Sequence, residues 1–275
     1  MSQINVFKLN NSINIPAVGM GVYQMPDNDN TRKAIEFALN IGYRHIDTAM
    51  IYGNERSVGK AVNSGIIPRK EIFITTKVWN SDHGYDQAIR AFNASLNRLQ
   101  LEYIDLYLIH WPVMGKRKET WRALETLYNE GKVRAIGVSN YMVQHLNELL
   151  GHCKITPAVN QLELHPFIYG SRIEIINLCH KNNILPVAYS PLTKGEKLRD
   201  PFLIKKASKY RKNTAQLMLR WGIQHGFAVI PKSSVTSRIA ENKQIFDFEI
   251  LPDDMIALDK LNEHLATGWD PSDML

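Results

Sequence analysis

Short runs of apolar and β-branched residues alternate along the chain with longer segments of helical periodicity. Apolar runs of about four to eight residues predict buried strands, and apolar positions three and four apart predict helices with one buried face. The predicted strands are Ala17–Val22, Tyr43–Asp47, Ile72–Lys77, Ile104–Ile109, Arg134–Val138, Ala158–Gln161, Leu185–Tyr189 and Ala228–Ile230. The clearest helical patterns are Thr31–Asn40, Tyr85–Leu99, Lys118–Glu130 and Arg172–Asn182. This alternation is typical of α/β proteins built from βα units.

Eight predicted strands with helices between them favour a closed (β/α)8 barrel, the TIM barrel, over an open sheet. The chain has 275 residues, and such a barrel needs roughly 250. Val6–Ile15, with an Asn-Asn turn signal at its centre, predicts an N-terminal β-hairpin that covers one end of the barrel. Leu251–Leu261 predicts an extra C-terminal helix, and a tail follows at His264–Leu275. No linker or low-complexity segment divides the sequence, so we expect residues 1–275 to form one domain.

Composition and charge exclude several classes of protein. With 44% hydrophobic and 22% charged residues, the chain has ordinary globular composition. The net charge is +6, and the main basic cluster lies on and after one short helical stretch. This placement favours a solvated helix face or attraction of a small anion over a nucleic-acid interface. The cluster consists of Arg199, Lys205, Lys206, Lys209, Arg211 and Lys212. We therefore expect no nucleic-acid partner.

The sequence also predicts where the protein resides. Cys153 and Cys179 cannot form a disulfide framework, which favours a reducing compartment. The N-terminus lacks a basic flank followed by an apolar run, so we expect no secretory signal. No stretch of about 18 apolar residues is present to cross a membrane. We expect a soluble cytoplasmic protein with no membrane partner.

Titratable side chains stand at the ends of three consecutive predicted strands. Asp47, Lys77 and His110 end these strands, and Tyr52 lies in the loop after the first of them. A barrel carries its chemistry at the C-terminal strand ends, and neighbouring strands lie about 5 Å apart, so the four groups can converge. Each alone has a structural interpretation, as an ion pair, a packed imidazole or a packed ring. Together they favour catalysis.

The four groups suit proton donation to a carbonyl oxygen. A free phenol titrates near pH 10, and a neighbouring ammonium lowers that pKa. We expect Lys77, held in place by Asp47, to lower the pKa of Tyr52, which then acts as the general acid when hydride reaches a carbonyl carbon. A neutral His110 would hydrogen-bond the carbonyl oxygen and aim it at Tyr52.

The sequence gives little support for a metal site, a serine nucleophile or a Rossmann nucleotide-binding fold. His45, His110 and His165 lie on or after different predicted strands without helical ligand spacing, so we expect no metal site. No serine sits on a Gly-x-Ser-x-Gly turn. The Gly-Met-Gly at residues 19–21 does not extend to Gly-x-Gly-x-x-Gly, so a nicotinamide cofactor has to bind through other loops than those of a Rossmann fold.

Three separated motifs resemble those of the aldo-keto reductase superfamily. They are residues 42–49 (GYRHIDTA) with 52–55 (YGNE), residues 106–112 (LYLIHWP) and residues 230–233 (IPKS), in the order of the family. The resemblance covers essentially the whole chain and implies a monomeric, NADPH-dependent reductase of aldehydes and ketones on a (β/α)8 barrel. It is strongest to the compact microbial group of 2,5-diketogluconate reductases, glyoxal reductases and prostaglandin F synthases.

The resemblance also assigns roles to residues. As catalytic residues it implies Asp47, Tyr52, Lys77 and His110. For NADPH it implies Ser139, Asn140, Gln161, Tyr189, Ser190, Leu192, Lys232, Ser233, Arg238, Glu241 and Asn242. Among these, Tyr189 would stack on the nicotinamide, and the cations Lys232 and Arg238 would hold the 2′-phosphate, which favours NADPH over NADH. The substrate pocket would be lined by Tyr23, Trp79, His110 and Trp111, where the two tryptophans have packing as their alternative role.

Two segments depart from the family pattern, and some interpretations stay open. After Leu192 the family commonly has a Gly-rich turn, whereas this chain reads TKGEK, leaving Lys194 to contact a phosphate. The segment after Trp111 is short, which predicts an open site with broad substrate tolerance. Trp269 in the tail either closes over the substrate or belongs to a frayed terminus. The alternative functions are an NADPH-binding redox-sensing module with little turnover, and a (β/α)8 lyase or isomerase acting on sugar phosphates.

Overall fold

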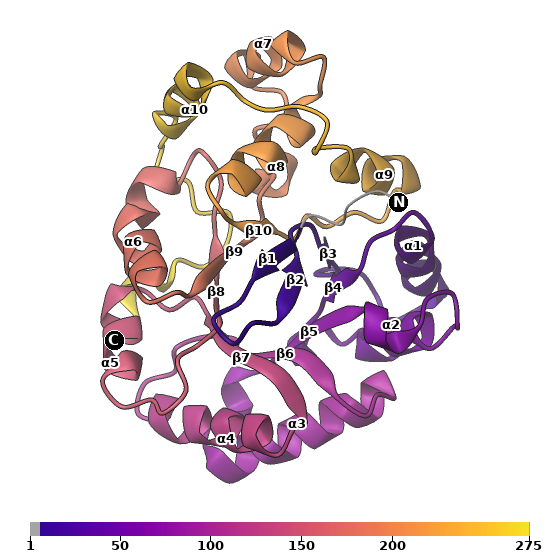
Figure 1. Ribbon diagram of the computed structural model, residues 1–275, viewed down its shortest axis with the longest axis vertical. Helices are drawn as coiled ribbons and strands as arrows, with labels where there is room; N and C mark the ends of the chain where they lie inside the picture. Colours follow the sequence, from indigo (N-terminus) through magenta and orange to yellow (C-terminus); the bar gives the residue numbers. More distant parts are fainter. Residues whose placement is uncertain (1–5, 275) are drawn as a thin grey trace.

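Eight parallel strands form a barrel surrounded by helices in the computed structural model, which describes residues 6–274 (Figure 1). The strands follow one another around the barrel in chain order and are β3 (Met20–Gly21), β4 (His45–Asp47), β5 (Phe73–Val78), β6 (Ile104–Ile109), β7 (Val133–Ser139), β8 (Val159–Glu163), β9 (Leu185–Tyr189) and β10 (Ala228–Val229). Parallel bridges from Val18 to Val229 and from Gly21 to Lys232 join the first strand to the last and close the barrel. The predicted (β/α)8 fold is confirmed.

Helices cover the outside of this barrel. They are α1 (Asp29–Asn40), α2 (Glu55–Val62), α3 (Tyr85–Leu99), α4 (Arg117–Asn129), α5 (Val143–Leu150), α6 (Ile173–Lys181), α7 (Pro201–Lys209), α8 (Thr214–Gln224), α9 (Thr236–Lys243) and α10 (Pro252–Asp259). The four segments with the clearest helical pattern became α1, α3, α4 and α6 within two residues at each end, and the predicted extra helix is α10. Asn28 caps α1 and Asn213 caps α8, because each side-chain oxygen accepts from backbone N–H groups of the first turn.

The predicted hairpin is formed by β1 (Val6–Lys8) and β2 (Asn14–Pro16), and it lies across one end of the barrel (Figure 1). The side chain of Asn10 donates to the carbonyl of Pro157 at 3.0 Å, and that of Asn11 donates to the carbonyl of Arg134 at 2.9 Å. These backbone groups precede β8 and lie at the start of β7, so the hairpin caps the N-terminal ends of the strands. The hairpin does not cover the opposite end of the barrel, where the C-terminal ends of the strands lie.

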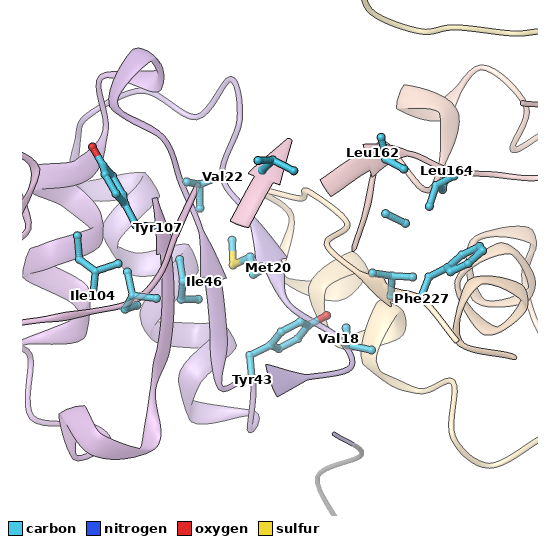
Figure 2. Packing of buried hydrophobic residues seen from close by; sticks show 14 of the residues in the cluster. Val18, Met20, Val22, Tyr43, Ile46, Ile104, Tyr107, Leu162, Leu164 and Phe227 are labelled. Atoms are coloured by element: carbon cyan, nitrogen blue, oxygen red, sulfur yellow. The ribbon is translucent and has the colours of Figure 1, made fainter. Parts of the chain in front are cut away.

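The strand residues divide between two apolar clusters, as the two-residue period of a strand requires. Inside the barrel, residues such as Phe73, Leu106 and Val159 pack with Leu9 and Ile15 of the hairpin. Outside it, alternating residues such as Ile46 and Tyr107 pack against the helices; Figure 2 shows part of this larger cluster.

The barrel interior changes from apolar to polar toward the C-terminal strand ends. Next to Phe73, His45 Nε2 shares a 2.9 Å hydrogen bond with Thr75 Oγ1, and the following inward residues are Asp47 and Lys77. The hairpin end is therefore a packed core, whereas the other end gathers ionisable groups.

A buried carboxylate near the hairpin end joins three segments. Asp105 of β6 accepts from Arg69 at 2.7 Å, from Arg134 at 2.8 Å and from the backbone N–H of Ile74 at 3.0 Å. It is completely buried, so these contacts provide its solvation. Because it lies at the start of its strand, we interpret it as structural.

Within residues 6–274 no helix is both long enough and apolar enough to cross a membrane.

Candidate active site

Adjacent strands β4 and β5 bring an ion pair to the open end of the barrel. Lys77 Nζ donates to Asp47 Oδ1 at 2.7 Å and to the backbone carbonyl of Thr48 at 2.8 Å, and both charged side chains are buried. Burial lowers the pKa of Lys77, while the Asp47 carboxylate opposes this effect. The ammonium is thus held at a fixed place with little contact with water.

Tyr52 lies on a short 3-10 helix, Met50–Tyr52, that directly follows β4. Lys77 Nζ lies over its ring, 5.1 Å from the centroid, and the ring of His110 is 5.8 Å away at 74°. The structure therefore brings all four predicted catalytic residues together. The pKa of Tyr52, however, is raised well above its ordinary value, first by burial and then by the charge of Asp47, opposite to the expected direction. Asp47 neutralises the nearby ammonium, so burial decides the shift and the phenol keeps its proton.

His110 follows β6 directly and is almost completely buried. Burial lowers its pKa well below the ordinary value, and Lys77 and His83 lower it further. The imidazole is therefore neutral, the form expected for a group that hydrogen-bonds a carbonyl oxygen. Trp79, directly after β5, presents its ring to His110 edge-on at 5.2 Å, while Trp111 lies 6.4 Å away in a stacked orientation.

The residues expected at the nicotinamide form one hydrogen-bonded network with the ion pair. Gln161 Nε2 donates to Asp47 Oδ2 at 2.8 Å, and its backbone carbonyl accepts from Ser139 Oγ at 2.9 Å. Asn140 Nδ2 donates to Ser139 Oγ at 3.1 Å, and Asn140 Oδ1 accepts from Tyr189 OH at 2.9 Å. These bonds run across the ends of β7, β8 and β9 to β4.

Two residues of this region have left-handed backbone conformations. Asn140, directly after β7, has φ +63°, and Ser190, directly after β9, has φ +45°. Such conformations are unfavourable for residues other than glycine and are concentrated at functional sites. At Asn140 the turn brings Nδ2 within 3.0 Å of the backbone carbonyl of His110.

The residues expected at the adenosine phosphate lie apart from the ion pair, after β10 and on α9. Lys232 and Arg238 are exposed cations, and neither has an ion-pair partner among residues 6–274. Ser233 and Asn242 are buried beside them, and exposed Glu241 accepts from Asn213 at 3.1 Å. Two unpaired cations fit an anionic group such as a phosphate.

Aromatic rings lie at the predicted substrate side of the site. Tyr23 is 47% exposed, and its ring lies 5.0 Å from that of Tyr52. The segment between β6 and α4 is short, as the sequence indicates. In its place the C-terminal tail contributes Trp269, whose ring lies 4.8 Å from that of Trp111. The tail therefore reaches the predicted substrate pocket.

The loop after Leu192 forms a short 3-10 helix, Thr193–Gly195. Thr193 and Lys194 both have φ +50°. Lys194 donates to the backbone carbonyl of Thr267 in the tail, and its contact with a phosphate stays a prediction.

Sequence reasoning missed two groups at this end of the barrel. One is the carbonyl of Thr48, which has no sequence signal because any residue supplies a backbone oxygen. The other is Glu163, the last residue of β8, which is buried and bound to Thr267. The predicted strand ended two residues too early, at Gln161; a longer strand would have shown an acidic side chain at its end. Among residues 6–274 there is no group of three or more His, Cys, Asp or Glu side chains placed to hold a metal ion.

Comparisons with known proteins show the family to which the chain belongs. Residues 17–263 match the model of the Aldo/keto reductase family. The chain belongs to this family, and it is accordingly an oxidoreductase. It is 48% identical to the 9,11-endoperoxide prostaglandin H2 reductase of Trypanosoma cruzi (97% of this chain, 95% of that protein). It is 47% identical to the glyoxal reductase of Bacillus subtilis, over 98% of this chain and 96% of that protein.

Solved structures show the same barrel. An aldo/keto reductase from Brucella melitensis superimposes with a TM-score of 0.90 at 46% identity, covering 94% of this chain and all of that chain. An aldo-keto reductase complexed with NADPH superimposes with a TM-score of 0.91 at 34% identity, covering 97% of this chain and 90% of that one. The fold and the family expected from the sequence are confirmed.

Proposed function

We propose that this protein reduces aldehydes and ketones to alcohols with NADPH. The observation that carries the proposal is the convergence of Tyr52, the Lys77–Asp47 pair and neutral His110 at one end of the barrel. A phenol, a fixed ammonium and an imidazole suit a substrate whose oxygen gains negative charge as it reacts.

The chain's own residues fit NADPH at both of its ends. Tyr189 is a half-buried ring fixed by Asn140, which suits stacking on a nicotinamide, and Ser139, Asn140 and Gln161 offer amide and hydroxyl groups for its carboxamide. The unpaired Lys232 and Arg238 suit its 2′-phosphate. When bound, NADPH would supply the hydride.

Each catalytic side chain then has one role. His110 donates to the carbonyl oxygen and orients it. Tyr52 holds its proton because burial keeps its pKa high, and it transfers that proton to the oxygen as negative charge develops there. The phenolate left on Tyr52 is stabilised by the ammonium of Lys77, and Asp47 keeps that ammonium in position.

Substrate range and assembly belong to the same proposal. Only a short segment separates β6 from α4, which supports broad tolerance of carbonyl compounds. The glyoxal reductase relative supports small dicarbonyls among them. We further propose a monomeric cytoplasmic protein, in agreement with its free cysteines Cys153 and Cys179, which sedimentation velocity and cell fractionation would test.

The decisive experiment compares Tyr52→Phe with Tyr128→Phe. Oxidation of NADPH is followed after addition of methylglyoxal or a nitrobenzaldehyde, and NADPH binding is measured separately by fluorescence titration. We expect Tyr52→Phe to reduce kcat by about 100-fold or more, the scale of general acid catalysis, while the Kd for NADPH stays nearly unchanged. Tyr128→Phe removes a half-buried phenol on α4, outside the proposed site, and should stay within a few-fold of the wild type.

The outcomes separate the alternatives. Equal losses of turnover and of NADPH affinity in Tyr52→Phe would contradict its role as the acid. NADPH binding without turnover of any carbonyl by the wild type would favour the redox-sensing module, and binding of a phosphosugar without NADPH would favour the lyase or isomerase.

A further inference from the structure

The C-terminal segment of residues 265–274, here called the strap, lies over the open end of the barrel although it belongs to no strand or long helix. Near its start Leu265 donates its backbone N–H to the carbonyl of Phe167 at 3.1 Å. Farther along, Arg172 binds Asp270 at 3.0 Å and Ser272 at 3.1 Å. The strap is thus fixed at both ends and is not a frayed terminus.

Between these two anchors, the strap is attached at Thr267 to a buried carboxylate. Glu163 Oε1 accepts the backbone N–H of Thr267 at 2.9 Å and also accepts its hydroxyl. The same oxygen lies 3.3 Å from His165 Nε2. Burial alone would raise the pKa of Glu163, but hydrogen bonds from His165 and Thr267 outweigh it and lower the pKa, so Glu163 is an anion. A buried anion requires these donors, because an unpaired buried charge is costly.

Glu163 has no evident part in the proposed proton transfer. Its hydrogen bonds point to the strap and to His165, whereas the Lys77–Asp47 pair and Tyr52 have their own partners. The catalytic end of a barrel strand therefore carries a buried carboxylate that binds the strap.

Two residues beyond Thr267, the strap carries the side chain of Trp269. This indole is 60% exposed, yet its ring lies 4.8 Å from Trp111, which in turn stacks on His110. A large exposed aromatic side chain next to a reacting centre is typical of a binding surface. With Thr267 held by Glu163, the backbone leading to Trp269 has a fixed starting point.

We propose that Glu163 is a positioning residue that holds Trp269 against Trp111 by binding Thr267, and so creates a wall selective for carbonyl compounds with an aromatic or extended apolar group. The inference rests on the proposed reductase function. Small dicarbonyls, which lack such a group, gain little from the Trp111–Trp269 wall. Aromatic aldehydes gain by packing their ring on it.

The experiment uses Thr267→Val, which removes the hydroxyl and keeps the backbone, with Thr126→Val on α4 as the matched control. Kinetic constants are measured for 4-nitrobenzaldehyde and methylglyoxal, and the Kd for NADPH is measured separately. Circular dichroism reports the exciton coupling between Trp111 and Trp269, and its assignment comes from Trp269→Phe. Glu163→Gln serves as a second variant at the other side of the contact.

We expect Thr267→Val and Glu163→Gln to raise the KM for 4-nitrobenzaldehyde about tenfold, a change of about 1.4 kcal/mol in binding. The KM for methylglyoxal should change by less than about twofold, a difference of only about 0.4 kcal/mol. The same limit applies to the kcat for both substrates and to the Kd for NADPH. The exciton signal should weaken in both variants, and Thr126→Val should match the wild type.

Three results would overturn the inference: an equal loss with both substrates, a loss of NADPH affinity as large as the change in KM, or an exciton signal unchanged in Thr267→Val. If the wild-type protein reduces no carbonyl at all, the proposed function fails. The exciton signal still decides whether Glu163 and Thr267 position Trp269.

Discussion

Gln161 donates its side-chain amide to Asp47 at 2.8 Å, although 114 positions separate the two residues in the chain. Asp47 uses its other oxygen for Lys77. A residue of the proposed nicotinamide site thus holds the carboxylate that fixes the ammonium, so cofactor binding and proton transfer share one hydrogen-bonded network. The following predictions test parts of this arrangement and of the fold that supports it.

Asp47→Asn should lower activity mainly at neutral and alkaline pH. Without the Asp47 carboxylate, only the charge of Glu55 still opposes the burial that lowers the pKa of Lys77, so the ammonium loses its proton at a lower pH. The alkaline limb of the kcat profile should therefore move to lower pH, and activity should recover partly on acidification. Lys77→Met is the control, because it should be inactive across the profile. An unshifted alkaline limb in Asp47→Asn would show that Lys77 does not need its charge.

Arg238→Ala and Lys232→Met should each weaken NADPH binding without weakening NADH binding. Hydrogen bonds to charged groups contribute about 1.5–3 kcal/mol, so each variant should raise the Kd for NADPH roughly 10- to 100-fold. Fluorescence titration with both cofactors measures the difference. Lys60→Met, which removes an exposed cation on α2, should leave both constants unchanged. A parallel loss for NADPH and NADH would place the 2′-phosphate elsewhere.

Asp105→Ala should lower the free energy of unfolding and leave kcat unchanged. It leaves Arg69 and Arg134 without their carboxylate and the buried backbone N–H of Ile74 without its acceptor, and an unsatisfied buried donor costs about 1–3 kcal/mol. Urea unfolding should show this loss, while kcat below the unfolding range should equal that of the wild type. A large fall in kcat with unchanged stability would contradict the structural role.

The protein should lose stability as the pH falls from about 6.5 toward 4. Burial lowers the pKa of His45 to about 4 in the folded protein, whereas an unfolded histidine titrates near 6.5. Between these values the unfolded chain binds more protons, so stability is complete above 6.5 and falls by about 1.4 kcal/mol per pH unit for this group. Urea titrations at several pH values measure the slope. His45→Gln should reduce the slope of the free energy of unfolding against pH, whereas Thr75→Val, which keeps the imidazole, should leave it unchanged. Identical slopes in the wild type and His45→Gln would show that His45 does not cause the loss of stability.

The sequence predicts the barrel and the convergence of the four proposed catalytic side chains because both depend on local signals. Asp47, Lys77 and His110 each follow a strand with a clear apolar pattern, and barrel geometry then brings the strand ends together. The longest helices were predicted nearly to the residue. Helices of eight residues, such as α2 and α9, give only about two turns, so their periodicity is weaker.

Relationships that depend on packing are not predictable in this way. The segment 17–22 reads as a strand, yet only Met20–Gly21 forms one, next to a close approach between Gly19 and His45 where a Cβ atom would lie 2.5 Å from Nδ1. The direction of the Tyr52 pKa shift depends on how deeply the ring is buried, which no motif shows. The contact of Glu163 with Thr267 joins positions 104 apart, neither of which belongs to a recognised motif.

The hairpin and the strap lie at opposite ends of the barrel, and this has a practical consequence for protein engineering. A fusion partner or surface linker attached before β1 is connected on the face that the hairpin covers, away from Tyr52 and His110. An attachment after the strap pulls on Trp269 and on the contact with Glu163. N-terminal tags are therefore the appropriate choice for kinetic work, and C-terminal tags would perturb the apparent preference among substrates.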